Sequence, residues 1–91
     1  MTNDNPSQSL LHFPCEFVIK IFGHAQEDFE LQVLTIIRRH IQDLPEDAIK
    51  NRLSKDGKYL ALTITMPIDS REQLDAIYQE LSSNPAILMV L

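Results

Sequence analysis

A single cysteine, Cys15, is the only thiol in this sequence, so an internal disulfide is excluded. An unpaired cysteine is typical of a reducing compartment, and we expect a cytoplasmic protein. Positive charge is also scarce: eight Lys and Arg stand against thirteen Asp and Glu, which gives a formal net charge of −5. This balance disfavours nonspecific binding to nucleic-acid phosphates or to anionic membranes.

Long apolar runs are missing as well. None approaches the roughly 20 residues that a helix needs to span a bilayer. Residues 1–9 have neither the basic start nor the apolar run of a signal peptide. Residues 1–11 are polar, so we expect a flexible amino terminus followed by one domain over residues 12–91. A domain of this size uses nearly every element to close its core, which leaves little room for a deep active site.

The hydrophobic period changes along the chain from that of a strand to that of a helix. Residues 16–22 are rich in β-branched and aromatic side chains and predict a first strand. Residues 26–41 repeat apolar side chains at helical spacing. Leu44-Pro45 closes that helix, because proline disfavours helical geometry in the residue before it. Residues 86–91 predict a short apolar strand at the carboxyl end.

The middle of the chain has the pattern of a hairpin with Asp56-Gly57 at its tip. A two-residue type I′ turn needs positive φ at both positions, which this pair accommodates. The turn fixes the register, so Leu53 is predicted to face Leu60. The same register places Asn51 on the apolar side of its strand, where an edge position would leave the amide partly hydrated.

A second helix follows the hairpin, after Pro67 ends the third strand. Two overlapping capping boxes mark its start, Asp69 with Glu72 and Ser70 with Gln73. The order of elements is therefore β-α-β-β-α-β. This order predicts an α+β, ferredoxin-like sandwich with an antiparallel sheet in the order 4-1-3-2 and both helices on one face.

The residues also resemble the small bacterial YbeD-like family from about Leu10 onward. The segments that carry the resemblance are His12-Phe13-Pro14-Cys15-Glu16-Phe17, Lys20-Ile21-Phe22-Gly23, Arg39-His40, Ser54-Lys55-Asp56-Gly57-Lys58-Tyr59, Glu72-Gln73-Leu74, Tyr78 and Met89-Val90-Leu91. That family is largely of unknown function, and its fold is similar to the regulatory ACT domain. One member carries a label that links it to lipoate metabolism. The resemblance thus implies a bacterial, cytoplasmic, regulatory domain and brings no established catalytic residues.

Metal binding and thiol catalysis are both disfavoured by the placement of histidine and cysteine. His12, Cys15 and the more distant His24 supply one loose pair of ligands, whereas structural zinc sites use two recognisable pairs. A Cys15–His24 nucleophile and base would lie at opposite ends of a strand, about 20 Å apart. The sequence therefore predicts no metal, no cofactor and no catalytic residues, and hence a protein that is not an enzyme.

The turn Gly23-His24-Ala25-Gln26 leads into the first helix. Free N–H groups and the helix dipole favour an anion at such a place. Gly23, His24 and Gln26 are therefore candidate contacts for a small anionic metabolite. The alternative is that Gly23 only turns the chain and that His24 is solvated. The Arg of acylphosphatases and the Cys-x-x-Cys pair of copper chaperones are both missing from this turn.

The sheet face without helices is the second candidate site. Strand alternation places Val18, Lys20 and Phe22 outward, and an apolar patch rimmed by cations is typical of a contact surface. The candidate interaction face consists of Val18, Lys20, Phe22, Lys50, Arg52 and Tyr59. RNA recognition is disfavoured, because Tyr59 is a lone aromatic on its strand and the chain is acidic.

These observations lead to a non-enzymatic regulatory or interaction domain that contacts a protein through its open sheet face. The partner is either a different protein or a second copy of the chain. Sensing of an anionic metabolite at the Gly23–Gln26 turn is the alternative. Nucleic acids and membranes are not expected partners.

Overall fold

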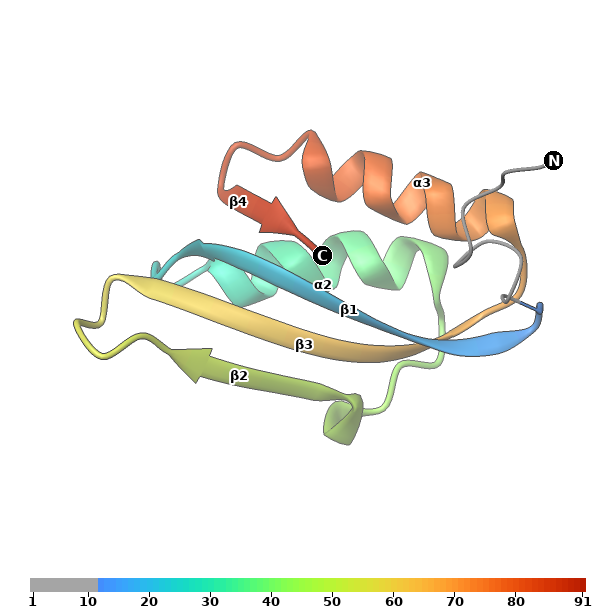
Figure 1. The fold of residues 1–91 in the computed structure, drawn as a ribbon, viewed down its shortest axis with the longest axis horizontal. Coiled ribbons are helices and arrows are strands. Elements are labelled where there is room, and N and C mark those ends of the chain that lie inside the picture. The colour runs from blue at the N-terminus through green and yellow to red at the C-terminus, as the bar shows by residue number, and fades with distance from the viewer. Residues whose placement is uncertain (1–11) are drawn as a thin grey trace, which may run out of the picture.

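A four-stranded antiparallel sheet with two helices packed on one of its faces forms the domain (Figure 1). The computed structural model describes residues 12–91. Its elements are β1 (Cys15–His24), α2 (Phe29–His40), the 3-10 turn η1 (Glu46–Ala48), β2 (Ile49–Leu53), β3 (Tyr59–Ile68), α3 (Arg71–Ser82) and β4 (Ile87–Val90). The sheet order β2-β3-β1-β4 confirms the predicted topology.

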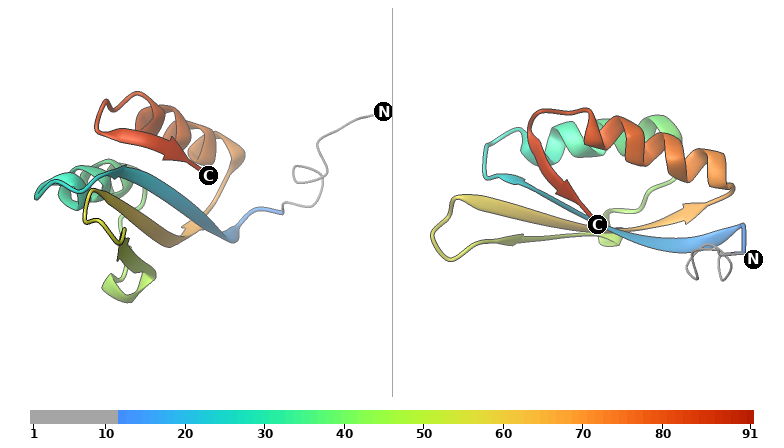
Figure 2. Two further views of the ribbon diagram at one scale, coloured as in Figure 1. Left: turned by 60° about the vertical axis from the view of Figure 1, so that its left-hand side comes forward. Right: turned by 45° about the horizontal axis from the view of Figure 1, so that its top comes forward.

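The core lies between the sheet and the two helices, which cover the same face in both views of Figure 2. β1 and β3 are the central strands, and each residue that points toward the helices alternates with one that points away. Ile19 and Ile21 point toward the helices and are fully buried, whereas Val18 points to the other face of the sheet and is 51% exposed. The helices contribute the apolar stripes Phe29, Val33, Ile36, Ile37 and Leu74, Ile77, Leu81.

The hairpin of β2 and β3 has the predicted register. Leu53 pairs with Leu60. The predicted two-residue turn is wrong, however: the N–H of Gly57 donates to the carbonyl of Ser54 at 3.0 Å, so Lys55 and Asp56 are the central residues of the turn. Gly57 follows them with a φ of 74°. Asn51 lies on the edge strand and is exposed, as predicted. Its side-chain amide donates to Oε1 of Glu30 at 3.0 Å, so this edge position is tied to the start of α2.

Several element boundaries differ from the prediction. β1 continues through Gly23 to His24, and α2 begins only at Phe29 and ends at His40. β3 does not end at Pro67 but continues to Ile68. The backbone groups of Lys20 bond toward β4, so those of its partner Thr63 on β3 point away from β1, toward β2. Pro67 is four residues from Thr63 and has the same orientation, so its missing N–H would also point toward β2. β2 begins only opposite Ile64, so Pro67 costs no ladder bond there.

The second helix forms one of the two hydrogen bonds of the predicted Ser70–Gln73 capping box. Ser70 is the N-cap residue, and its hydroxyl accepts from the backbone N–H of Gln73 at 3.1 Å. The side chain of Gln73 accepts from the N–H of Asp69 at 2.7 Å and donates to the carbonyl oxygen of His40 at 2.9 Å. Gln73 therefore fixes the start of α3 against the end of α2.

Candidate functional site

The open face of the sheet is made of outward-pointing side chains from all four strands. One row across the sheet consists of Arg52, Ala61, Phe22 and Met89. A second row consists of Lys50, Thr63, Lys20 and Leu91. Leu91 follows β4, and its backbone exchanges two hydrogen bonds with Lys20, of 2.8 and 3.1 Å. The two rows place cations on β2 and at Lys20 of β1, and apolar groups at Met89 of β4 and at Leu91.

The apolar side chains of this face are accessible to solvent. Val18, Met89 and Leu91 are each more than half exposed, and Tyr59 is 45% exposed. Phe22 is partly buried between its neighbours Ala61 and Met89. A predominantly apolar group of this kind, spread over adjacent strands, is typical of a surface that binds another molecule.

An aromatic pair lies at the end of the open face near the hairpin tip. The rings of His24 and Tyr59 lie with their centroids 5.4 Å apart and their planes tilted by 32°. The two residues are also register partners on β1 and β3. The structure therefore joins His24, predicted as part of the turn, to Tyr59, predicted as part of the face.

Gly23 of the predicted turn site has a packing reason for its missing side chain. A Cβ at this position would lie 2.5 Å from Cζ of Phe29 and 2.6 Å from the carbonyl oxygen of Ala86. Both distances are far below van der Waals contact. Gly23 allows β1 to pass directly over the first residue of α2, which accounts for the glycine without any ligand.

The backbone of the turn is largely occupied by internal hydrogen bonds. The N–H of Ala25 donates to the carbonyl of Lys58 at 2.8 Å, and the N–H of Gln26 donates to the carbonyl of His24 at 2.9 Å. The side chains of Glu27, Asp28 and Glu30 surround the helix start. Their negative charges oppose the attraction of the helix dipole for an anion. The metabolite hypothesis gains no support from this geometry and stays a prediction.

The histidine and cysteine residues considered as ligands or catalysts are not brought together. Cys15 and His24 are the first and last residues of β1, about 30 Å apart at the rise of an extended strand. Cys15 is partly buried, and His12 is exposed. Within residues 12–91 no three His, Cys, Asp or Glu side chains gather as a metal site would require.

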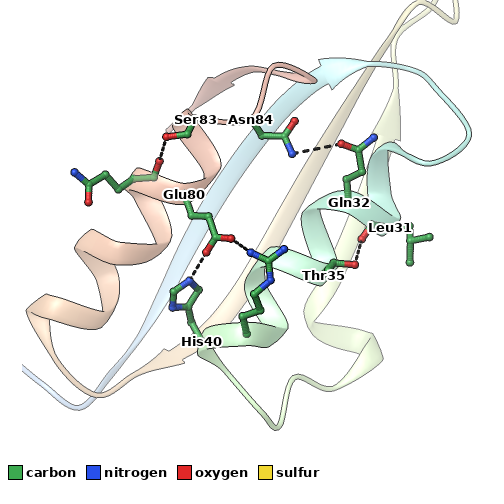
Figure 3. A network of polar contacts seen from close by, with 9 residues as sticks. Leu31, Gln32, Thr35, His40, Glu80, Ser83 and Asn84 are labelled. Atoms are coloured by element: carbon green, nitrogen blue, oxygen red, sulfur yellow. Dashed lines mark hydrogen bonds and ion pairs between the residues drawn. The ribbon is translucent and has the colours of Figure 1, made fainter.

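A groove between α2 and α3 was not predicted from the sequence (Figure 3). It has a volume of about 560 Å³ and lies on the side of the helices away from the sheet, with Leu31 and Asn84 among its lining residues. At one end Glu80 accepts a hydrogen bond from His40 at 2.8 Å and pairs with Arg39. At the other end, Asn84 of the segment after α3 donates to Gln32 at 3.4 Å.

The polar groups of this groove serve each other. Glu80 has two partners on the facing helix, and Gln32 is bonded to both Asn84 and Asp28. Arg39 and Glu80 are both open to solvent, which screens their attraction. These contacts join α2 to α3 and the segment after it, and each of these polar side chains already has a partner within the protein.

Tyr78 packs between α3 and the sheet. Its ring meets that of Phe17 edge-on, with centroids 6.3 Å apart and an angle of 76° between the planes. Burial raises the pKa of the Tyr78 hydroxyl above its ordinary value. The phenol therefore stays protonated at neutral pH and contributes packing at the amino-terminal half of β1.

Among residues 12–91, no helix has the length and apolar character required to cross a membrane.

Relatives of the chain are small bacterial proteins without an established function. The chain is 40% identical to the UPF0250 protein NE1487 of Nitrosomonas europaea over 92% of its own length and 97% of that protein. It is 38% identical over the full length of both chains to a UPF0250 protein of a Janthinobacterium species. The solution structure of protein HP0495 from H. pylori has a TM-score of 0.68 at 17% identity and covers 99% of this chain and 98% of its own. That structure supports the fold.

The family model described as a protein of unknown function, DUF493, matches residues 8–91. Together with the relatives, this match confirms the expected resemblance to a small bacterial family of unknown function. The chain belongs to the DUF493 family.

Proposed function

We propose that this chain is a non-enzymatic interaction domain that binds a protein partner through the open face of its sheet. The observation that carries the proposal is the exposure of Val18, Met89 and Leu91 beside the cations Lys20 and Arg52. None of these side chains contributes to the core, which lies on the other face of the sheet. Burying them in an interface would gain about 25 cal/mol for each Å² of apolar surface.

A regulatory role for this contact is what the ACT-like fold of the YbeD-like family implies, and a link to lipoate metabolism is implied by the label of one member of that family. The geometry supports the binding part of the proposal. Cys15 and His24, the thiol and imidazole that were considered as a catalytic pair, are separated by the whole length of β1.

The test is capture of partners from bacterial lysate with the tagged wild-type chain, Val18→Asp and Leu31→Asp. Both substitutions place a carboxylate at an exposed apolar position, but Val18 is on the open face and Leu31 is on α2 beside the groove. We expect Val18→Asp to lose the captured protein and Leu31→Asp to retain it. Circular dichroism and the melting temperature check that each variant is folded.

Equal capture by wild type and Val18→Asp would exclude the open face as the binding surface. Loss of capture in Leu31→Asp alone would move the site to the helical layer. Sedimentation of the wild-type chain and Val18→Asp by themselves distinguishes a different protein from a second copy as the partner.

A further inference from the structure

The cations of this acidic chain are concentrated on the open face and at the hairpin tip. Five of the eight Lys and Arg residues lie there, namely Lys20, Lys50, Arg52, Lys55 and Lys58. Most carboxylates of residues 12–91 lie elsewhere, around the start of α2, in the loop that contains η1 and along α3. The molecule is therefore electrically polarised, although its net charge is −5.

The open face itself has two unlike halves. The half nearer the hairpin tip contains Arg52 and Lys20 together with the apolar Phe22 and Met89. The opposite end contains Glu16, which is paired with Pro67 and lines a recess together with Asp47 and Lys50. The half that combines Arg52 and Lys20 with Phe22 and Met89 we call the hairpin half. The other end carries carboxylates beside Lys50 and the apolar Val18.

The cations of the hairpin half are free to meet a partner. Within residues 12–91, the side-chain ion pairs shorter than 4.0 Å join Glu80 to Arg39 and His40 on the helical layer. Neither Lys20 nor Arg52 has a carboxylate within that distance in the described part of the chain. Both side chains are exposed.

The spacing of the two kinds of group limits the shape of the partner. Arg52 on β2 and Met89 on β4 lie three strand spacings apart, about 14 Å at about 4.8 Å for each spacing. An α-helix with its side chains is about 10–12 Å wide. A helix lying over Phe22 and Met89 would therefore bring the side chains on one of its flanks to Arg52 and Lys20.

We propose that the hairpin half of the open face binds an acidic amphipathic helix of another protein. The apolar stripe of that helix rests on Phe22 and Met89, and carboxylates on one flank pair with Arg52 and Lys20. This inference rests on the proposed function and specifies its partner. Charge complementarity of this kind adds specificity and accelerates association.

A second copy of the chain fits this half less well. Two copies that align their hairpin halves bring Lys20 and Arg52 of both chains into one interface, and like charges in an interface are costly. Two copies that align the hairpin half with the Glu16 end match the charges. That arrangement places Phe22 and Met89 over the charged Glu16 as well as Val18 and Pro67, whereas the leucine stripe of a helix presents apolar side chains alone.

Single-stranded nucleic acid, the other common polyanion, is also a poorer fit. Base stacking needs free aromatic faces. One face of Tyr59 is covered by His24, and Phe22 is partly buried between its neighbours.

The test uses the full chain labelled with ¹⁵N and three synthetic helical peptides of about 18 residues, roughly five turns. The peptides share one leucine stripe and carry Glu, Gln or Lys on the flank. An oligouridine is the fourth probe. We expect the Glu peptide to bind at least about tenfold more tightly than the Gln peptide at low salt, and added salt to weaken it. Its chemical-shift changes should centre on Phe22, Ala61 and Met89.

Arg52→Glu and Arg38→Glu form the matched pair of variants, because both reverse one exposed cation and change the net charge equally. Arg52 lies on the open face and Arg38 on α2. We expect Arg52→Glu to weaken binding of the Glu peptide about tenfold or more and Arg38→Glu to leave it within about twofold, as expected for a distant surface charge screened by salt.

Equal binding of the Gln and Glu peptides would overturn the acidic partner and leave the open face as a binding surface. A wild-type dimer that Val18→Asp dissociates would also overturn the acidic partner, because the partner of the open face would then be a second copy of the chain. Tighter binding of oligouridine than of the Glu peptide, shifts confined to α2 and α3, or no binding of any peptide would also overturn the inference. The proposed function itself fails separately, in the capture experiment with Val18→Asp.

Discussion

Substitution of Gly23 separates a packing role from a ligand-binding role for the turn after β1. In Gly23→Ala the new methyl would lie 2.5 Å from Cζ of Phe29 and 2.6 Å from the carbonyl oxygen of Ala86. Phe29 is 1% exposed and is held by the core. The obstacle at Ala86 is backbone, which moves less easily than the end of a side chain. The variant must therefore displace the start of α2, the segment before β4, or both.

The expected cost is about 2 kcal/mol in the free energy of unfolding. Overpacking of a filled core costs about 1–3 kcal/mol, and a backbone obstacle favours the upper part of that range. Replacing Gly by Ala returns about 0.4–1 kcal/mol by restricting the unfolded chain, because Gly23 has no left-handed conformation to preserve. For a domain of this size, a net loss of about 2 kcal/mol lowers the melting temperature by about 8–16 °C.

Urea unfolding of four chains measures this effect: wild type, Gly23→Ala, Phe29→Leu and the double variant. Leucine at position 29 removes the ring that the new methyl meets, so Gly23→Ala should cost less in that background. The clash with Ala86 remains, so relief should be partial. If Gly23→Ala unfolds at the wild-type urea concentration, the packing explanation is wrong and a ligand becomes the better reason for the glycine.

Three further perturbations test local features of the fold by urea unfolding. Ser70→Ala should cost about 1 kcal/mol through loss of the α3 cap, and the exposed Ser82 gives a control substitution that should cost less. Gly57→Ala should lower the free energy of unfolding by about 1 kcal/mol, because the φ of 74° at this position is left-handed. A Cβ there meets nothing within 4 Å, and asparagine tolerates this conformation, so Gly57→Asn should lower the free energy of unfolding by less. The pKa of Asp56 is lowered from its ordinary value of 3.8, chiefly by the hydroxyl of Ser54, so its contribution to stability is complete above that value and lost as pH falls through the folded pKa. An equal acid sensitivity in Asp56→Asn would contradict this assignment.

The hairpin and the sheet order were predictable because they follow from local chemistry. Asp56-Gly57 marks the end of the hairpin, and the alternation of side chains on either side of it gives the partners of β2 and β3, although the turn itself is centred on Lys55-Asp56. Strand alternation then assigns Val18 and Phe22 to the open face from their positions alone. Each of these steps uses residues that are neighbours in the sequence.

The features that were missed depend on contacts between distant parts of the chain. Pro67 was expected to end β3, but its effect depends on where β2 begins on the neighbouring strand. Glu80 and His40 are forty residues apart, and their contact depends on how α2 and α3 cross. Gly23 suggested a turn, whereas its cause is the approach of Phe29 from the next helix. No period in the sequence encodes such distances.

The two candidate sites differ in how strongly they are coupled to the stability of the fold. On β1, the buried Ile19 alternates with the exposed Val18, so a side chain of the open face changes without touching the core. The turn has no such freedom, because Gly23 packs on Phe29. Loss of binding at constant unfolding free energy therefore assigns a function to the open face. A function located at the Gly23 turn would instead be lost together with stability in Gly23→Ala, and His24→Ala, at an exposed position, would be needed to separate the two.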